Sequence, residues 1–73
     1  MKIFDARFFG VAINLKREME GISLRDLADK TGISASTLSR IENGEKPDID
    51  NAVNLIGWLN LSMDRFVVEE AKE

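Results

Sequence analysis

The stretch SLRDLADKTGISASTLSRIENG, residues 23–44, decides the fold of this chain. Ser23 is followed three positions later by Asp26. This spacing is typical of a helix N-cap residue and the acid of a capping box, in which Asp is a shorter substitute for the usual Glu. An apolar face comes next and consists of Leu24, Leu27 and Ala28. Because Thr31-Gly32 then ends the segment, the pattern predicts a short helix that begins near Leu24.

A second short helix is predicted immediately after the first. Ser34 is another N-cap residue, and Leu38 and Ile41 face inward at helical spacing. Asn43-Gly44 is a strong stop signal. Two short helices joined by a tight turn that contains glycine are the composition cue for a helix-turn-helix motif. The sequence therefore predicts this motif from about Leu24 to Asn43.

The segment before the motif predicts a first helix from about Phe4 to Glu20. Phe9, Ile13 and Arg17 recur at intervals of four residues, which places them on one helical face. Gly21 follows the last of these turns, and glycine is the residue that most easily takes the left-handed conformation at a helix C-terminus.

Two more helices are predicted after the motif. A fourth runs from about Asp48 to Leu59, where Asp48 and Asp50 suit the positive end of the helix dipole. Its expected buried stripe consists of Ile49, Ala52, Val53, Ile56 and Leu59. Asn60 ends it, and Ser62 caps a short fifth helix that carries Met63, Phe66 and Val67. We expect a single domain over residues 1–73, with residues 69–73 as a frayed tail.

The net charge of −3 argues at first against nucleic-acid binding, because phosphates favour basic proteins. The charge is unevenly distributed. Residues 1–47 carry eight Lys and Arg against seven Asp and Glu, whereas residues 48–73 carry two against six. Since the acidity belongs to the C-terminal third, that part can point away from a duplex, and the composition permits DNA binding.

The chain contains neither cysteine nor histidine, so disulfides and the usual zinc ligand sets are excluded. Asp5 and Arg7 interrupt the N-terminal apolar residues, so we expect no signal peptide there, and no apolar run reaches the ~18 residues of a membrane span. We expect a cytoplasmic protein without a membrane partner. No nucleophile with an adjacent base is evident, so we expect no enzyme, no cofactor and no small-molecule ligand.

Residues 21–66, with an extension back to Arg17, closely resemble the phage-repressor-like (Xre/Cro) helix-turn-helix family. The specific signals are L-A-x-x-x-G-I-S over residues 27–34 and L-S-R-I-E-N-G over residues 38–44. Pro47 follows, and Ile49 begins the fourth helix. The resemblance implies an all-α fold, a compact five-helix bundle of the lambda-repressor type with the helix-turn-helix at helices two and three.

The resemblance also implies residue roles. The recognition helix would span about Ser34 to Glu42 and enter the major groove of DNA. The positions that meet base edges are Ala35, Ser36 and Arg40. The positions near phosphates are Ser34, Thr37, Ser39, Asn43 and Lys46. Arg17 and Glu42 match an internal ion pair that joins the first and third helices.

The chain departs from the family pattern at two places. Leu24 stands where the family usually has a glutamine that contacts phosphate, and the neighbouring Arg25 is our candidate for that contact. Lys16 stands where the family tends to have an apolar residue, and this chain has Leu15 beside it instead.

Arg40 is the strongest candidate for base recognition. Its guanidinium offers two parallel donors that match the O6 and N7 acceptors of guanine. The alternative is an ordinary solvated arginine on an exposed helix face. Ala35 and Ser36 are small enough to let the helix approach the groove closely, and Lys46 is either a phosphate contact or a routine loop lysine.

Gly57 and Trp58 in the fourth helix have two open interpretations. They are either a tolerated glycine beside a core aromatic, or part of a two-fold interface where helices approach closely. The residues assigned to that interface are Trp58, Phe66, Val67 and Val68. A homodimer would suit the family, because two recognition helices then fit half-sites one turn apart.

The leading functional hypothesis is a sequence-specific, double-stranded DNA-binding transcriptional regulator from a prokaryote or phage, acting as a repressor at an operator. The alternative is a protein-interaction module of the same fold, antitoxin-like or a partner of another regulator. A basic face around Arg25, Arg40 and Lys46 would favour DNA. A face interrupted by acids would favour a protein partner, and those acids are Asp26, Asp29 and Glu45.

Overall fold

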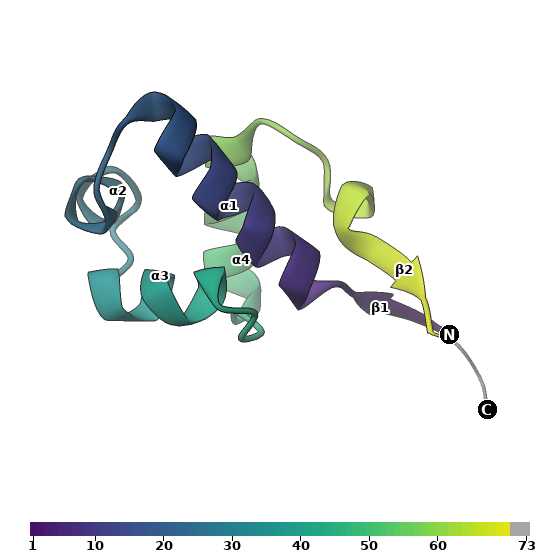
Figure 1. Cartoon of the computed structure of the whole chain (residues 1–73). Helices are drawn as coiled ribbons and strands as arrows, with labels where there is room; N and C mark the ends of the chain where they lie inside the picture. The colour runs from purple at the N-terminus through teal and green to yellow at the C-terminus, as the bar shows by residue number, and fades with distance from the viewer. Residues whose placement is uncertain (71–73) are drawn as a thin grey trace.

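The computed structural model describes residues 1–70, and these form four α-helices, one 3-10 turn and a two-stranded sheet. In chain order the elements are β1 (Lys2–Phe4), α1 (Ala6–Glu20), α2 (Leu24–Thr31), α3 (Ala35–Glu42), α4 (Ile49–Leu59), η1 (Met63–Phe66) and β2 (Val67–Glu69). Helix α1 crosses in front of α4 and above α3, with α2 at one end and the β1–β2 ribbon at the other (Figure 1). None of the helices in residues 1–70 is long and apolar enough to cross a membrane.

The predicted helix-turn-helix boundaries are confirmed, because its local signals form as expected. Ser23 Oγ accepts a hydrogen bond from the Asp26 amide at 3.0 Å, and the Asp26 carboxylate accepts one from the Ser23 amide at 3.0 Å. This backbone hydrogen bond is the main reason that the pKa of Asp26 lies below its ordinary value. Gly32 ends α2 at φ 75°, in the left-handed region that favours glycine.

The core lies between α1 and the helices that it covers. The largest fully buried side chains are Phe9, Ile13, Leu27, Leu38, Leu55 and Phe66. Phe66 stacks edge-on against Phe9 with ring centroids 5.0 Å apart. The inward residues that were predicted for the first three helices are therefore confirmed, and the remaining elements close over them.

The predicted fifth helix is wrong. Residues 63–66 form only one 3-10 turn, and the chain then continues as β2, which pairs antiparallel with β1. Phe4, predicted to begin α1, lies instead in β1 opposite Val67, because Asp5 caps α1 by accepting from the Phe8 amide at 3.0 Å. The Asp5 amide donates to the carbonyl of Phe66 at 2.6 Å, which joins the two ends of the domain.

The frayed tail is also wrong for the residues that the structure describes. Glu69 belongs to β2, and the Glu70 amide donates to the Met1 carbonyl at 2.8 Å. Residues 71–73 of the predicted tail lie outside the described residues.

The buried stripe predicted for α4 is partly wrong. Ile49 and Val53 are exposed, whereas Leu55, which the prediction omitted, is completely buried with Ala52 and Leu59 beside it. Apolar residues occupy more than half of the circumference of α4, so periodicity alone could not choose its inward face. The observed orientation of α4 about its own axis brings it into contact with α2, and Asn54 Nδ2 donates a hydrogen bond of 2.6 Å to the Thr31 carbonyl.

Candidate nucleic-acid interface

The outward face of α3 follows from the burial of its inward face. Leu38 and Ile41 pack into the core, so the residues on the opposite side of the helix face solvent. Ser36 and Arg40 are four residues apart and therefore lie on that side of the helix, where both are exposed. Ala35 lies beside them and is half-buried. The structure thus brings the three predicted base-facing residues together on one surface of α3.

The first turn of α3 is held by hydroxyl groups. Ser34 Oγ accepts from the Thr37 amide at 3.2 Å, and the two side-chain hydroxyls lie 2.9 Å apart in a further hydrogen bond. Capping one amide in this way leaves other backbone N–H groups of the first turn open toward solvent. Such amides, together with the helix dipole, suit a phosphate oxygen.

Arg40 has an acidic neighbour, Glu45, which is one of the acids that could interrupt the basic face. Its Nε lies 3.4 Å from Glu45 Oε1, and both side chains are more than half exposed. Arg40 Nη2 also approaches Thr37 Oγ1 at 3.5 Å. An exposed ion pair of this kind contributes little to stability, so the guanidinium can leave it at small cost.

The other predicted phosphate contacts come from α2, from the end of α3 and from the loop after it. Asn43 Nδ2 donates to the Ser39 carbonyl at 2.9 Å, which uses one of the hydrogen-bond donors of its side-chain amide. Arg25 lies exposed on α2, and Lys46 lies on the loop between α3 and α4. Asp29 is exposed on α2 as well, so the surface around α3 carries both basic and acidic groups.

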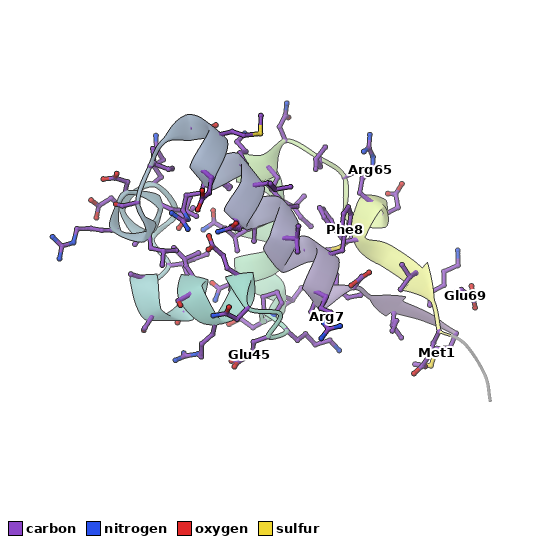
Figure 2. The ribbon with its side chains drawn as sticks, in the orientation of Figure 1. Met1, Arg7, Phe8, Glu45, Arg65 and Glu69 are labelled. Atoms are coloured by element: carbon purple, nitrogen blue, oxygen red, sulfur yellow. The ribbon has the colours of Figure 1, made fainter. Side chains whose placement is uncertain are left out.

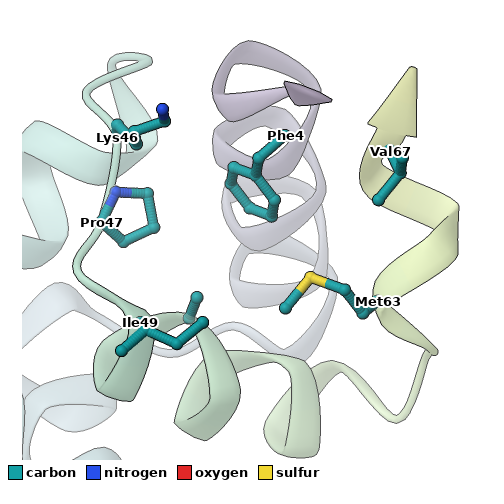
Figure 3. Close-up of a pocket in the computed structure, with 7 residues that line it drawn as sticks. Phe4, Lys46, Pro47, Ile49, Met63 and Val67 are labelled. Atoms are coloured by element: carbon teal, nitrogen blue, oxygen red, sulfur yellow. The ribbon is translucent and has the colours of Figure 1, made fainter. Parts of the chain in front are cut away.

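Lys46 lies at the edge of an apolar hollow of about 280 Å³. Figure 3 shows the hollow between the α3–α4 loop, the start of α4 and the two strands. Its lining residues are Phe4, Lys46, Pro47, Ile49, Ala52, Met63 and Val67. The lining is apolar apart from the Lys46 side chain, so this hollow offers shape but no group for chemistry.

A part-buried ion pair joins α3 to α1. Arg17 Nε donates to Glu42 Oε2 at 2.8 Å, and Arg17 Nη2 donates to Oε1 at 3.1 Å. The pair that the family resemblance implied is therefore present, with side chains only 14% and 9% exposed. The hydrogen bond to Glu42 raises the pKa of Arg17 above its ordinary value.

The Glu42 carboxylate has a second partner residue that sequence reasoning missed. Asn14 Nδ2 donates to Glu42 Oε1 at 3.0 Å, and Arg17 Nη1 reaches the Ile22 carbonyl at 3.0 Å. Asn14 precedes Arg17 by three positions, so the two side chains share a side of α1. The three-residue spacing of Asn14 and Arg17 was the sequence signal that could have predicted a shared partner.

Gly10 is a second residue that sequence reasoning missed. A Cβ atom at this position would collide with the carbonyl oxygen of Ile41 and lie 2.9 Å from that of Glu42. The backbone of α1 therefore rests directly on the last turn of α3. Gly10 and the Arg17–Glu42 pair together determine how α3 is held against α1.

The predicted dimer surface is not assembled as expected. Phe66 is completely buried, so its assignment to an interface is wrong, and Val67 partly lines the hollow beside β1. Trp58 packs against the core at its edge, with the Lys16 ammonium 5.1 Å from its ring centroid. Val68 is exposed on β2, while a Cβ atom added to Gly57 on α4 would have open space around it.

Comparison with known protein families gives a match to the helix-turn-helix family over residues 13–66. Comparisons with curated proteins and with solved structures give no match. The matched range covers most of the chain and contains α2 and α3, the anchoring pair Arg17–Glu42 and all of α4. The chain therefore belongs to the Xre/Cro-like helix-turn-helix family of DNA-binding regulators.

Proposed function

We propose that this protein recognises a specific double-stranded operator and regulates transcription there as a repressor. The main support for the proposal is that Ser36 and Arg40 are both exposed on α3, and that this helix is held against α1 by the ion pair of Glu42 with Arg17. A short helix held this rigidly suits insertion into the major groove, where base edges are distinguishable. This role implies that the protein acts in the cytoplasm of a prokaryotic cell, whether the gene belongs to the cell or to a phage.

The residues divide into two roles in this proposal. Arg40 binds a guanine through its paired donors, Ser36 bonds to a neighbouring base, and Ala35 contacts a thymine methyl group. The contacts that position the helix on phosphates come from Arg25, Ser34, Thr37, Ser39, Asn43 and Lys46.

A selection from random DNA tests the proposal directly. The purified chain would be mixed at low salt with duplexes of about 30 base pairs, long enough for two half-sites one turn apart, and the retained DNA sequenced. Enrichment of one motif supports operator recognition, and an inverted repeat would indicate two copies per site. Folded protein that enriches no sequence would contradict the proposal.

Arg40→Ala should reduce affinity for the selected site by about fivefold to 150-fold and relax preference at one base pair, since a bidentate guanine contact contributes ~1–3 kcal/mol. Lys46→Ala is the contrasting variant. It should weaken every sequence equally and reduce the salt dependence of binding by about one counterion. Fluorescence anisotropy with matched and mutated duplexes distinguishes them. An equal loss on all sequences would make Arg40 a phosphate contact only.

Glu45→Gln should strengthen DNA binding about threefold at low salt. The substitution removes the carboxylate 3.4 Å from Arg40 Nε, which competes for the guanidinium and repels phosphate. Asp64→Asn removes an equal charge from an exposed site on η1 and serves as the control. If both variants gained equally, net charge alone would explain the effect and the local competition would be refuted.

A protein-interaction module is the second candidate function. The exposed acids Asp29 and Glu45 beside the basic residues, together with the net charge of −3, favour it. The random-duplex selection separates the candidates, because a module of this kind would enrich no DNA.

A further inference from the structure

Helix α1 has a second apolar face that the described residues cover only at its N-terminal end, where the Phe8 ring centroid lies 5.4 Å from that of Phe66. Its members are Phe8, Val11, Leu15 and Met19, all at least half exposed. They lie at intervals of three and four residues, so they form one continuous stripe along the helix. The stripe lies apart from Phe9 and Ile13, which point into the core. Helix α1 is therefore apolar on two sides, and the fold of one chain uses only one.

Opposite charges lie along one edge of this stripe. Arg7 is at the N-terminal end of α1 and Glu18 at the C-terminal end, eleven positions later and therefore on the same flank. Neither side chain belongs to an ion pair within the described residues. Figure 2 shows Arg7 and Phe8 at the start of α1, beyond the end of α3.

We propose that a second copy of this chain binds the stripe, with the two α1 helices packed antiparallel about a two-fold axis between Val11 and Leu15. In an antiparallel pair the same flank of each helix faces its counterpart. Arg7 of each copy therefore meets Glu18 of the other, which forms two equivalent ion pairs. A parallel two-fold pair would place this flank against the opposite flank of the partner helix and would form neither ion pair.

The shape of the surface supports the same arrangement. A hollow of about 500 Å³ lies between the start of α1 and the end of α3. Its lining residues are Asp5, Arg7, Phe8, Val11, Glu42, Asn43 and Gly44. Antiparallel packing brings Met19 of the second copy to this end of the helix. Met19 is the most exposed of the large apolar side chains on α1, and its flexible thioether suits an irregular hollow.

The size of the contact sets the expected strength. Helix α1 has 15 residues, about 22 Å of length, so two such helices bury on the order of 1,000 Å² in total. This is the lower end of the range for specific interfaces, and we expect a micromolar dimer. A two-fold rotation does not change the height of an atom along the rotation axis. The α3 helices of the two copies therefore lie at the same height along that axis. The pairing itself does not depend on DNA binding.

Leu15→Glu tests the surface, with Val53→Glu on α4 as a matched control. Leu15 and Val53 are 56% and 58% exposed, so neither substitution disturbs the core, and circular dichroism would verify both folds. Sedimentation equilibrium of the full chain should show the 8.2 kDa wild type doubling in mass across roughly 1–500 micromolar. Leu15→Glu should remain monomeric, and Val53→Glu should pair like the wild type.

Three results would overturn the proposal. They are a wild type that stays monomeric, a Leu15→Glu variant that still pairs, and a Val53→Glu variant that loses pairing. The last would place the interface on α4 instead.

Charge reversal tests the antiparallel register. Arg7→Glu and Glu18→Arg, each alone, place like charges together twice and should weaken pairing about tenfold at low salt. The double variant Arg7→Glu/Glu18→Arg restores both attractions and should recover the wild-type dissociation constant within about twofold. A double variant as weak as the single ones would refute this register.

Discussion

Gly10→Ala should lower the free energy of unfolding by about 3 kcal/mol, which corresponds to a melting temperature roughly 12–24 °C lower for a domain of this size. The added methyl group would overlap the Ile41 carbonyl oxygen and crowd that of Glu42. Both are backbone atoms at the end of α3 and cannot rotate away as a side chain can. The two helices must therefore separate, which also opens the core around Phe9.

Gly57→Ala is the matched control, because this second helical glycine has open space around the position of a Cβ atom. Alanine there should stabilise the chain by about 0.5–1 kcal/mol through helix propensity alone. Thermal and urea unfolding of both variants would measure the contrast. A Gly10→Ala variant as stable as the wild type would contradict the close approach of α1 and α3.

Glu42→Ala should cost about 3–5 kcal/mol, because it leaves the Arg17 guanidinium mostly buried without its counter-charge. It also removes the acceptor of Asn14 Nδ2. A domain of this size has a stability of only about 5–15 kcal/mol, so a large fraction would unfold on modest heating. Circular dichroism melting curves would give the change.

The control for Glu42→Ala is Glu45→Ala, three positions further along the chain. Glu45 is exposed and its pair with Arg40 is solvated, so its removal should change stability by less than about 1 kcal/mol. Equal melting temperatures for the two variants would show that the part-buried Arg17–Glu42 pair does not anchor α3. DNA affinity should follow the folded fraction in Glu42→Ala.

The elements that the sequence determined are those whose signals lie within a few residues. Ser23 with Asp26, Ser34 with Thr37, and Gly32 act through hydrogen bonds or dihedral preferences between near neighbours. The pattern therefore predicted α2 and α3, their separation, and the side of α3 left for contacts. The family motif added the partnership of Arg17 with Glu42, which spacing alone could not supply.

The tertiary structure decided what depends on distant segments. Phe4 became a strand residue because β2, more than sixty positions later, supplied its hydrogen-bonding partner, and a short apolar run has no preference strong enough to resist this. The same holds for Ile49 and Leu55 in α4, where apolar residues over more than half of the circumference left the inward face to be chosen by packing. Gly10 is the clearest case. Local propensity favours alanine there, and only the backbone of α3 against α1 excludes it.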